Sequence, residues 1–130
     1  MAVRDIENNF LKQFSSYEDC CPPGVRLPNL EIDEKYYKKL KISTSSSNFE
    51  FLSKLCDFSI KDKSIDKFNN YKDYQDRLAY ELNTLQELGF IDYILLNWDV
   101  INFCKENAIP TGPGRGSAAG SLVLYLIGVP

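Results

Sequence analysis

Five of the seven glycines in this chain lie within residues 111–130, which read TGPGRGSAAGSLVLYLIGVP. Glycine permits positive φ and lets a ligand approach the backbone closely. Arg115 stands between Gly114 and Gly116, and Ser117 comes next. The amides of such a loop can converge on an anion, an arginine can make two hydrogen bonds to a phosphate, and a serine adds a hydroxyl. The pattern therefore predicts a phosphate-binding loop, and a tight turn with an exposed arginine is the alternative.

Two known nucleotide-binding motifs come close to this loop but fit it poorly. The Walker A motif requires Gly-Lys-Ser/Thr, and the stretch contains no lysine. Residues 114–119, GRGSAA, match the loose G-x-G-x-x-A dinucleotide fingerprint, which needs a preceding strand and an acidic residue ~20 positions later. The residues before Pro110 have a helical pattern instead. We therefore favour a phosphate site of another kind.

No catalytic residue is predicted in this chain, which contains no histidine. Asp92 and Asp99 would share one helix face, but at ~1.5 Å rise per residue they would lie roughly 10 Å apart. A two-metal site holds its ions ~3.5–4 Å apart. We therefore expect Asp92 to cap a helix and Asp99 to anchor a buried polar network.

The bulk composition is that of a globular protein. The 130 residues are 44% hydrophobic and 25% charged, with a net charge of −3, so the basic surplus of an autonomous nucleic-acid-binding domain is missing. We expect no signal peptide and no membrane partner, because no run approaches the ~20 apolar residues that span a bilayer. The cysteines lack metal-binding spacing, so we expect buried, reduced thiols and a cytoplasmic location. They are Cys20, Cys21, Cys56 and Cys104.

The first half of the chain carries weak structural signals. Hydrophobic spacing predicts a short helix over residues 3–14 and another over 48–58, capped by Asn48. Between them, residues 19–33 are broken by three prolines and a glycine, which is typical of an extended connector. A lysine-rich segment follows, for which a solvated face is expected and contact with a DNA backbone is the alternative. Its lysines are Lys35, Lys38, Lys39 and Lys41.

The second half has stronger helical signals. An apolar stripe over residues 71–88 predicts a helix, and Gly89 is placed to end it. The stripe consists of Tyr74, Leu78, Leu82, Leu85 and Leu88. The next helix, 92–107, is apolar on most faces and is therefore expected to be buried. A third helix is expected to begin at Ser117 and to add its positive dipole end to the phosphate-binding loop.

The string from Tyr74 to Gly128 resembles the α subunit of bacterial DNA polymerase III, the C-family replicative polymerase. The similarity covers YQDRL (74–78), YEL (80–82), LGF (88–90), Tyr93, Trp98, Asp99, Ile109, Pro110 and the run GPGRGSAAGSLV (112–123). That last run is far more specific than any three-glycine motif. Upstream, Cys20, Cys21, Leu27 and Pro28 are loosely similar to the stretch that leads out of the family's PHP domain.

The resemblance implies an α+β fragment, predominantly helical, that forms the first part of a DNA polymerase beta-like nucleotidyltransferase palm. Residues 1–70 would be a divergent connector leading from a PHP-like domain. Residues 71–130 would be the N-terminal part of the palm, with its triphosphate-binding loop. Gly116 and Ser117 match the Gly-Ser pair that holds the incoming nucleotide's triphosphate in that fold. Arg115 matches the family arginine expected near the phosphates, and Gly114 lies beside it.

The implied activity is that of a DNA-directed DNA polymerase, which adds deoxynucleotides to a primer 3′ end. Mg²⁺ would be bound by residues outside this chain, because the family's metal-binding aspartates come further along. The implied partners are dNTP, primer–template DNA and the remainder of the polymerase chain or a split-gene partner, and the piece alone would be inactive. A non-catalytic nucleotide- or phosphate-binding module and a purely structural helical domain are the alternatives. Because the third helix would lack its sheet partners, we also expect an exposed apolar surface.

Overall fold

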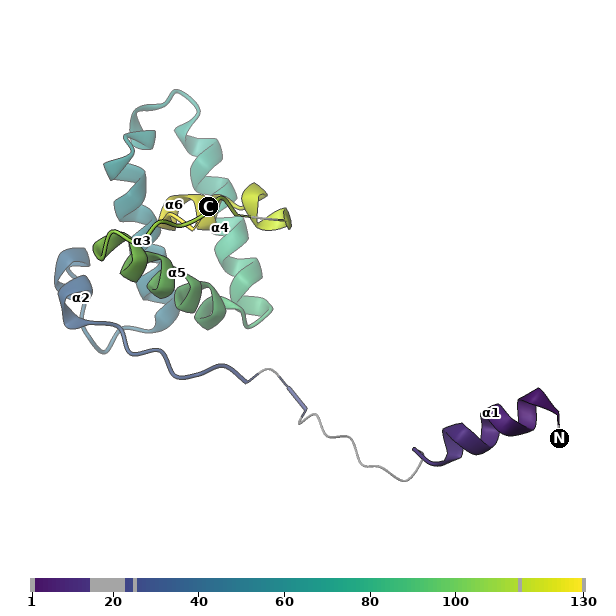
Figure 1. The fold of residues 1–130 in the computed structure, drawn as a ribbon. Coiled ribbons are helices and arrows are strands. Elements are labelled where there is room, and N and C mark those ends of the chain that lie inside the picture. Colours follow the sequence, from purple (N-terminus) through teal and green to yellow (C-terminus); the bar gives the residue numbers. More distant parts are fainter. Residues whose placement is uncertain (1, 15–22, 25, 115, 130) are drawn as a thin grey trace.

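The computed structural model describes residues 2–14, 23–24, 26–114 and 116–129, and within them the chain is helical (Figure 1). The elements are α1 (Val3–Lys12), α2 (Glu34–Leu40), α3 (Asn48–Asp62), the 3₁₀ helix η1 (Ile65–Lys67), α4 (Tyr71–Glu87), α5 (Ile91–Glu106), the 3₁₀ helix η2 (Gly116–Gly120) and α6 (Leu122–Ile127). The expected helical character is confirmed. No strand occurs among the described residues, so the mixed sheet of a palm stays a prediction.

Helix ends follow local side-chain and glycine signals. The Ser47 hydroxyl accepts a hydrogen bond from the Glu50 amide at 3.2 Å, so Ser47 caps α3 and the expected cap, Asn48, is its first residue. This helix also continues to Asp62, beyond the predicted end at 58. Gly89, at φ +72°, follows the end of α4 as predicted, in the left-handed conformation that favours glycine.

The core lies where α3, α5 and α6 meet. Phe51 and Leu52 of α3, Leu95 of α5 and Val123 of α6 are fully buried. The Phe51 ring packs against that of Trp98 with centroids 5.4 Å apart, an arrangement favoured by aromatic pairs. α6 packs against both α3 and α4, and Figure 1 shows it lying among the longer helices. The expected cause of an exposed apolar surface, a third helix without packing partners, is therefore wrong, because most apolar residues of α6 are buried, although Tyr125 is 58% exposed.

Exposed apolar side chains do occur, and several of them lie on α5 and α1. Tyr93, Val100 and Phe103 of α5 are 48%, 55% and 59% exposed, so the prediction that this helix is buried on most faces is wrong. The residues of α5 that face α3 and α2 are covered, and the opposite side is open to solvent. α1 buries none of its residues and contributes nothing to the core.

The lysine-rich segment forms a solvated face, as predicted. All four of its lysines are exposed, and Lys35 pairs with Glu106 of α5 at 3.2 Å. Tyr36 also donates a hydrogen bond to Glu106, at 2.5 Å. Exposed ion pairs of this kind contribute little stability, so these contacts chiefly fix where α2 lies against α5.

The thiol expectation is confirmed for Cys56 alone. Cys56 is fully buried in α3, and burial raises the pKa of its thiol to about 12, so it stays protonated. Cys104 is half-buried, and Cys20 and Cys21 lie outside the described residues. Within the described part of the chain, no helix is long and apolar enough to cross a membrane.

Candidate functional site

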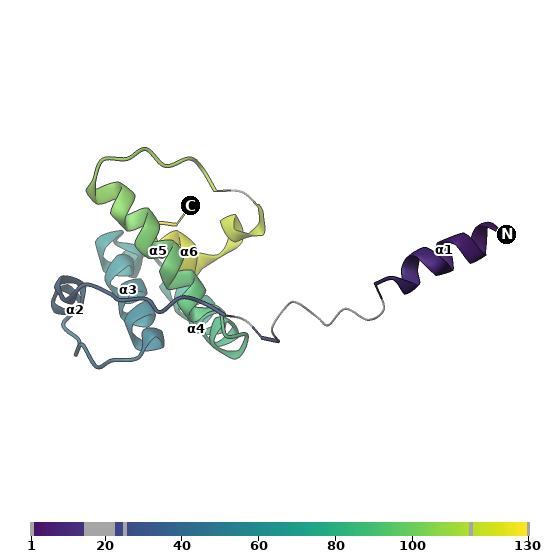
Figure 2. The ribbon, with the colours of Figure 1, turned by 60° about the horizontal axis from the view of Figure 1, so that its bottom comes forward.

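The predicted phosphate-binding loop lies on the surface between α5 and α6. Gly114, Gly116 and Ser117 are all exposed, while Arg115 lies outside the described residues. Residues 108–114 arc away from the helices after α5 (Figure 2). Gly116 begins η2 with φ +78°, a conformation that L side chains rarely adopt. The glycine there is thus required by the backbone, and Gly114 and Ser117 are open to solvent.

The α-helix that was predicted to begin at Ser117 is α6, which begins five residues later, at Leu122. Residues 116–120 form η2 instead, and Ser121 caps the α-helix by accepting a hydrogen bond from the Leu124 amide at 3.3 Å. Glycine is unfavourable in an α-helix, which helps to explain why Gly116–Gly120 does not extend α6. The Ser117 hydroxyl therefore does not lie at an α-helix start.

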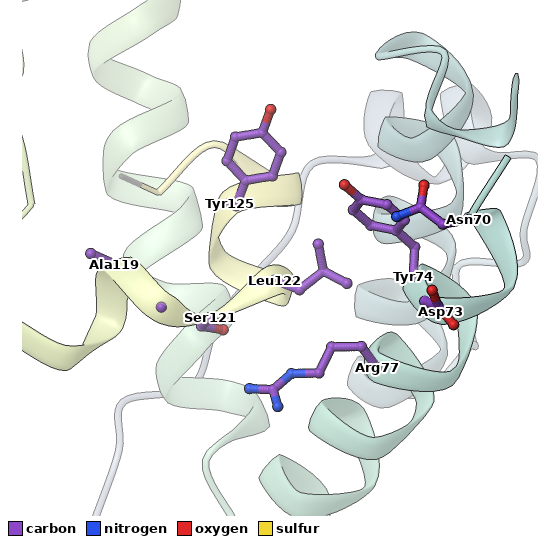
Figure 3. Close-up of a pocket in the computed structure, with 9 residues that line it drawn as sticks. Asn70, Asp73, Tyr74, Arg77, Ala119, Ser121, Leu122 and Tyr125 are labelled. Carbon is purple, nitrogen blue, oxygen red and sulfur yellow. The ribbon is translucent and has the colours of Figure 1, made fainter. Parts of the chain in front are cut away.

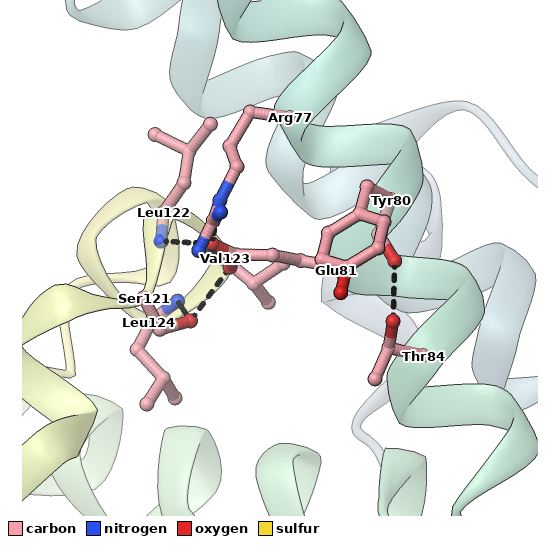
Figure 4. A network of polar contacts seen from close by, with 8 residues as sticks. All are labelled: Arg77, Tyr80, Glu81, Thr84, Ser121, Leu122, Val123 and Leu124. Carbon is pink, nitrogen blue, oxygen red and sulfur yellow. Dashed lines mark hydrogen bonds and ion pairs between the residues drawn. The ribbon is translucent and has the colours of Figure 1, made fainter.

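Glu81 of α4 occupies the N-terminus of α6 (Figure 4). Its carboxylate accepts hydrogen bonds from the amides of Leu122 and Val123 at 3.1 and 3.0 Å. It also accepts from the Ser121 hydroxyl at 2.8 Å and from Arg77 Nε at 2.7 Å. The expectation that this helix end would serve a phosphate is wrong, because a carboxylate of the same chain already uses its first amides.

The surroundings of Glu81 favour its charged form. Its side chain is only 9% exposed, and burial alone would oppose ionisation. The amides of Val123 and Leu122, together with Arg77 and Ser121, outweigh that effect, so the pKa of the Glu81 carboxyl lies below the ordinary range of a glutamate. The charge is thus shared between an arginine and the positive end of a helix.

This lowered pKa makes stability depend on pH. A carboxyl whose pKa is depressed by folding contributes stability above its unfolded pKa, about 4.3, and loses that contribution as pH falls through the folded pKa. We expect the difference in free energy of unfolding between wild type and Glu81→Gln to be largest near neutral pH and to shrink below about pH 4.3. Urea unfolding followed by circular dichroism at a series of pH values measures it.

The matched control for that experiment is Glu87→Gln, at the exposed end of α4. Its difference from wild type should change little over the same pH range. A gap between wild type and Glu81→Gln that stays constant down to pH 3 would contradict the linkage.

Asp92 and Asp99 do not have the roles that were expected for them. Asp92 is the second residue of α5, and its carboxylate accepts a hydrogen bond from Asn48 Nδ2 at 2.7 Å, which joins α5 to α3. Asp92 is therefore not a helix cap. Asp99 is half-buried and makes no side-chain hydrogen bond or ion pair with any described residue, so the buried polar network centres on Glu81 instead. Among the residues that the structure describes, no three His, Cys, Asp or Glu side chains gather where they could hold a metal ion.

Two of the cavities near the end of the loop are lined by Arg77. The larger, about 390 Å³, lies between the start of α4 and the residues that lead into α6 (Figure 3). Its lining includes Asp73, Tyr74, Arg77, Gly120, Leu122 and Tyr125. The second, about 310 Å³, extends along α4 to Thr84 and is the one that reaches Ser117. Sequence reasoning missed Arg77, although Arg77 and Glu81 stand at the i, i+4 spacing of a helical ion pair.

Comparisons with known proteins concern the same part of the chain. The family described as bacterial DNA polymerase III alpha NTPase domain matches residues 50–130. DNA polymerase III subunit alpha of Staphylococcus aureus (strain N315) is 35% identical over 126 residues, 96% of this chain and 11% of the relative. The Ureaplasma parvum protein of that name is 42% identical over 104 residues, 79% of this chain and 10% of the relative. The Aquifex aeolicus protein is 55% identical over 58 residues, 45% of this chain and 5% of the relative.

The chain thus spans about a tenth, or less, of the length of these relatives. No solved structure matches it.

Proposed function

Because this chain belongs to the bacterial DNA polymerase III alpha family, we propose that it is part of a DNA-directed DNA polymerase and binds the triphosphate of the incoming dNTP. The binding residues would be Gly114, Arg115, Gly116 and Ser117. The observation that carries the proposal is that the described members of this set are exposed, although the helix that follows them is buried in the core. An anion can therefore reach the loop.

The loop is held at both ends by the helices beside it. At its start, the Ile109 amide donates to the Cys104 carbonyl at 2.8 Å and closes α5. At its end, Glu81 fixes the first residues of α6. Anchored ends reduce the conformational entropy that a loop loses when it binds a ligand. A glycine-rich segment supported in this way can present its amides to a phosphate without collapsing onto the protein.

In the polymerase, residues 71–130 would form the first part of a palm and residues 1–70 a connector. Mg²⁺ ions would be bound by residues outside this chain, as the family resemblance implies. When bound, such ions stabilise the attacking and leaving oxygens of phosphoryl transfer. This chain's own part would be to hold and orient the triphosphate while the primer 3′-hydroxyl attacks. Primer–template DNA and the rest of the polymerase would be its partners, in the cytoplasm.

The experiment replaces the proposed cation of the loop in the polymerase that contains this chain. Arg115→Ala should raise the apparent KM for dNTP about tenfold or more, since a hydrogen bond to a charged group contributes ~1.5–3 kcal/mol. Steady-state incorporation on a saturating primer–template measures the change. Lys38→Ala, which removes an exposed lysine of α2, is the control. Incorporation kinetics within twofold of wild type for Arg115→Ala would contradict the proposal.

A further inference from the structure

Arg77 is a half-exposed cation with unused hydrogen-bond donors. Its side chain is 56% exposed, and its Nε donates to Glu81 Oε1 at 2.7 Å. A guanidinium has five N–H donors, and the remaining ones make no hydrogen bond with any residue in the described ranges. The side chain extends from α4 toward the residues that begin α6 (Figure 3).

The guanidinium is held in place before any ligand arrives. The Nε bond to Glu81 fixes one edge, and the charged group lies over the Tyr80 ring, with Cζ 5.6 Å from the ring centroid. A planar guanidinium that is oriented in this way loses less rotamer entropy when its other edge binds a phosphate. Figure 4 shows the three side chains together beside the start of α6.

Pairing with Glu81 does not cancel the charge of Arg77. The Glu81 carboxylate also accepts from two α6 amides and the Ser121 hydroxyl, so its negative charge is divided between the arginine and a helix N-terminus. Its oxygens therefore face donors on several sides. The groove beside Arg77 retains an excess of hydrogen-bond donors.

The surroundings favour one of the two cavities for an anion. The larger cavity includes the carboxylate of Asp73, which would repel a phosphate. The smaller one, here called the α4–η2 groove, is lined by Arg77, Tyr80, Thr84, Ser117 and Gly120 and has Glu81 and Arg77 as its charged residues. Of the two cavities, this groove is the one that joins Arg77 to Ser117, a residue of the proposed triphosphate loop.

We propose that Arg77 binds a phosphate group in the α4–η2 groove, together with the Ser117 hydroxyl. This inference rests on the proposed function and extends it to a residue of α4, forty positions before Ser117 in the sequence. The phosphate belongs either to the dNTP triphosphate or to the backbone of the primer–template. Both present the same oxygens to a guanidinium, and an experiment separates them.

The experiment compares Arg77→Gln with Lys72→Gln in the polymerase that contains this chain. Lys72 is an exposed residue of the same helix, and it lines neither cavity. Three quantities are measured for each variant: the KM for dNTP, the Ki of inorganic tripolyphosphate as an inhibitor, and the Kd for primer–template at several KCl concentrations. Thermal unfolding is followed in parallel.

A triphosphate contact predicts that Arg77→Gln raises the KM and the Ki about tenfold or more, with unchanged DNA affinity. A DNA-backbone contact predicts a weaker Kd and a salt slope of log Kd smaller by about 0.9, with unchanged KM. Either result supports the proposal and names the source of the phosphate.

Three results would overturn it. One is a change below twofold in all three quantities. Another is an equal change in Lys72→Gln, which would show a general charge effect. The third is a weaker Kd for primer–template whose dependence on KCl is unaltered. That result would indicate that Arg77 only supports Glu81. If Arg115→Ala raises the dNTP KM while Arg77→Gln does not, this inference fails and the proposed function stands.

Discussion

Replacing Glu81 with alanine should lower the free energy of unfolding by about 3 kcal/mol, because it leaves several hydrogen-bond donors without a partner. The amides of Leu122 and Val123 and the hydroxyl of Ser121 all donate to this carboxylate, and Val123 is fully buried. Each unsatisfied buried donor costs ~1–3 kcal/mol. Part of that cost is recovered here, because the half-exposed Arg77 and the neighbouring cavity admit water.

Chemical denaturation followed by circular dichroism measures this loss, and the melting temperature should fall by roughly 10 °C. Glu87→Ala is the matched control, since it removes an exposed carboxylate from the same helix. If the two variants differ by less than about 1 kcal/mol, the carboxylate cap is not the main support of α6. A real loss should also disturb the proposed triphosphate loop, because the first residues of α6 fix the end of η2.

The start of α6 shows where sequence reasoning reaches its limit. Ser117 and Ser121 both precede small or apolar residues, and each has the side chain of a helix cap. Gly120 disfavours an α-helix that begins at Ser117, but a single glycine does not exclude one. The choice is made by Glu81, which lies forty positions earlier and accepts hydrogen bonds from the residues after Ser121. A contact between residues so far apart in the sequence produces no periodic pattern from which it could be predicted.

Local sequence signals were sufficient to predict a helix where the helix has its own periodic apolar stripe. The apolar stripe of α4 and the glycine after it predicted that helix closely. Leu78 and Leu82 are buried as the stripe requires, whereas Leu88, just past the helix end, is 60% exposed. The same reasoning overestimated the burial of α5. Its apolar residues surround the helix, but α3 covers only one face, so Phe103 stays exposed. Composition tells which residues can be buried, whereas packing decides which of them are.

The candidate site likewise combines a loop that local sequence patterns indicate with a residue that only the folded structure brings near it. The glycine loop was visible as a cluster of residue types, and its described members are exposed. Arg77 carried no such signal, since a lone arginine in a helical stripe is ordinary. Its place beside Ser117 arises from the packing of α4 against α6. The tertiary structure therefore brings to the loop a cation, Arg77, that is not part of the glycine-rich motif.

Replacing Phe51 with alanine should destabilise the fold by about 4 kcal/mol, since deletion of a buried phenylalanine side chain costs ~3–5 kcal/mol. The Phe51 side chain is fully buried on α3, and its ring packs against Tyr37 and Trp98 at centroid distances of 5.2 and 5.4 Å. Its removal opens a cavity between α2, α3 and α5. Denaturation followed by the fluorescence of the single tryptophan, Trp98, reports on this place directly.

Phe103→Ala provides the comparison, because it deletes the same side chain from a position 59% exposed on α5. Its effect should stay within about 0.5 kcal/mol, as for most surface substitutions. Phe51→Leu retains most of the volume and should lose less than Phe51→Ala, which keeps the test readable if the alanine variant fails to fold. Equal losses for Phe51→Ala and Phe103→Ala would mean that the helices do not meet around Phe51. The anchoring of α5 and α6, and with it the support of the loop between them, would then need another explanation.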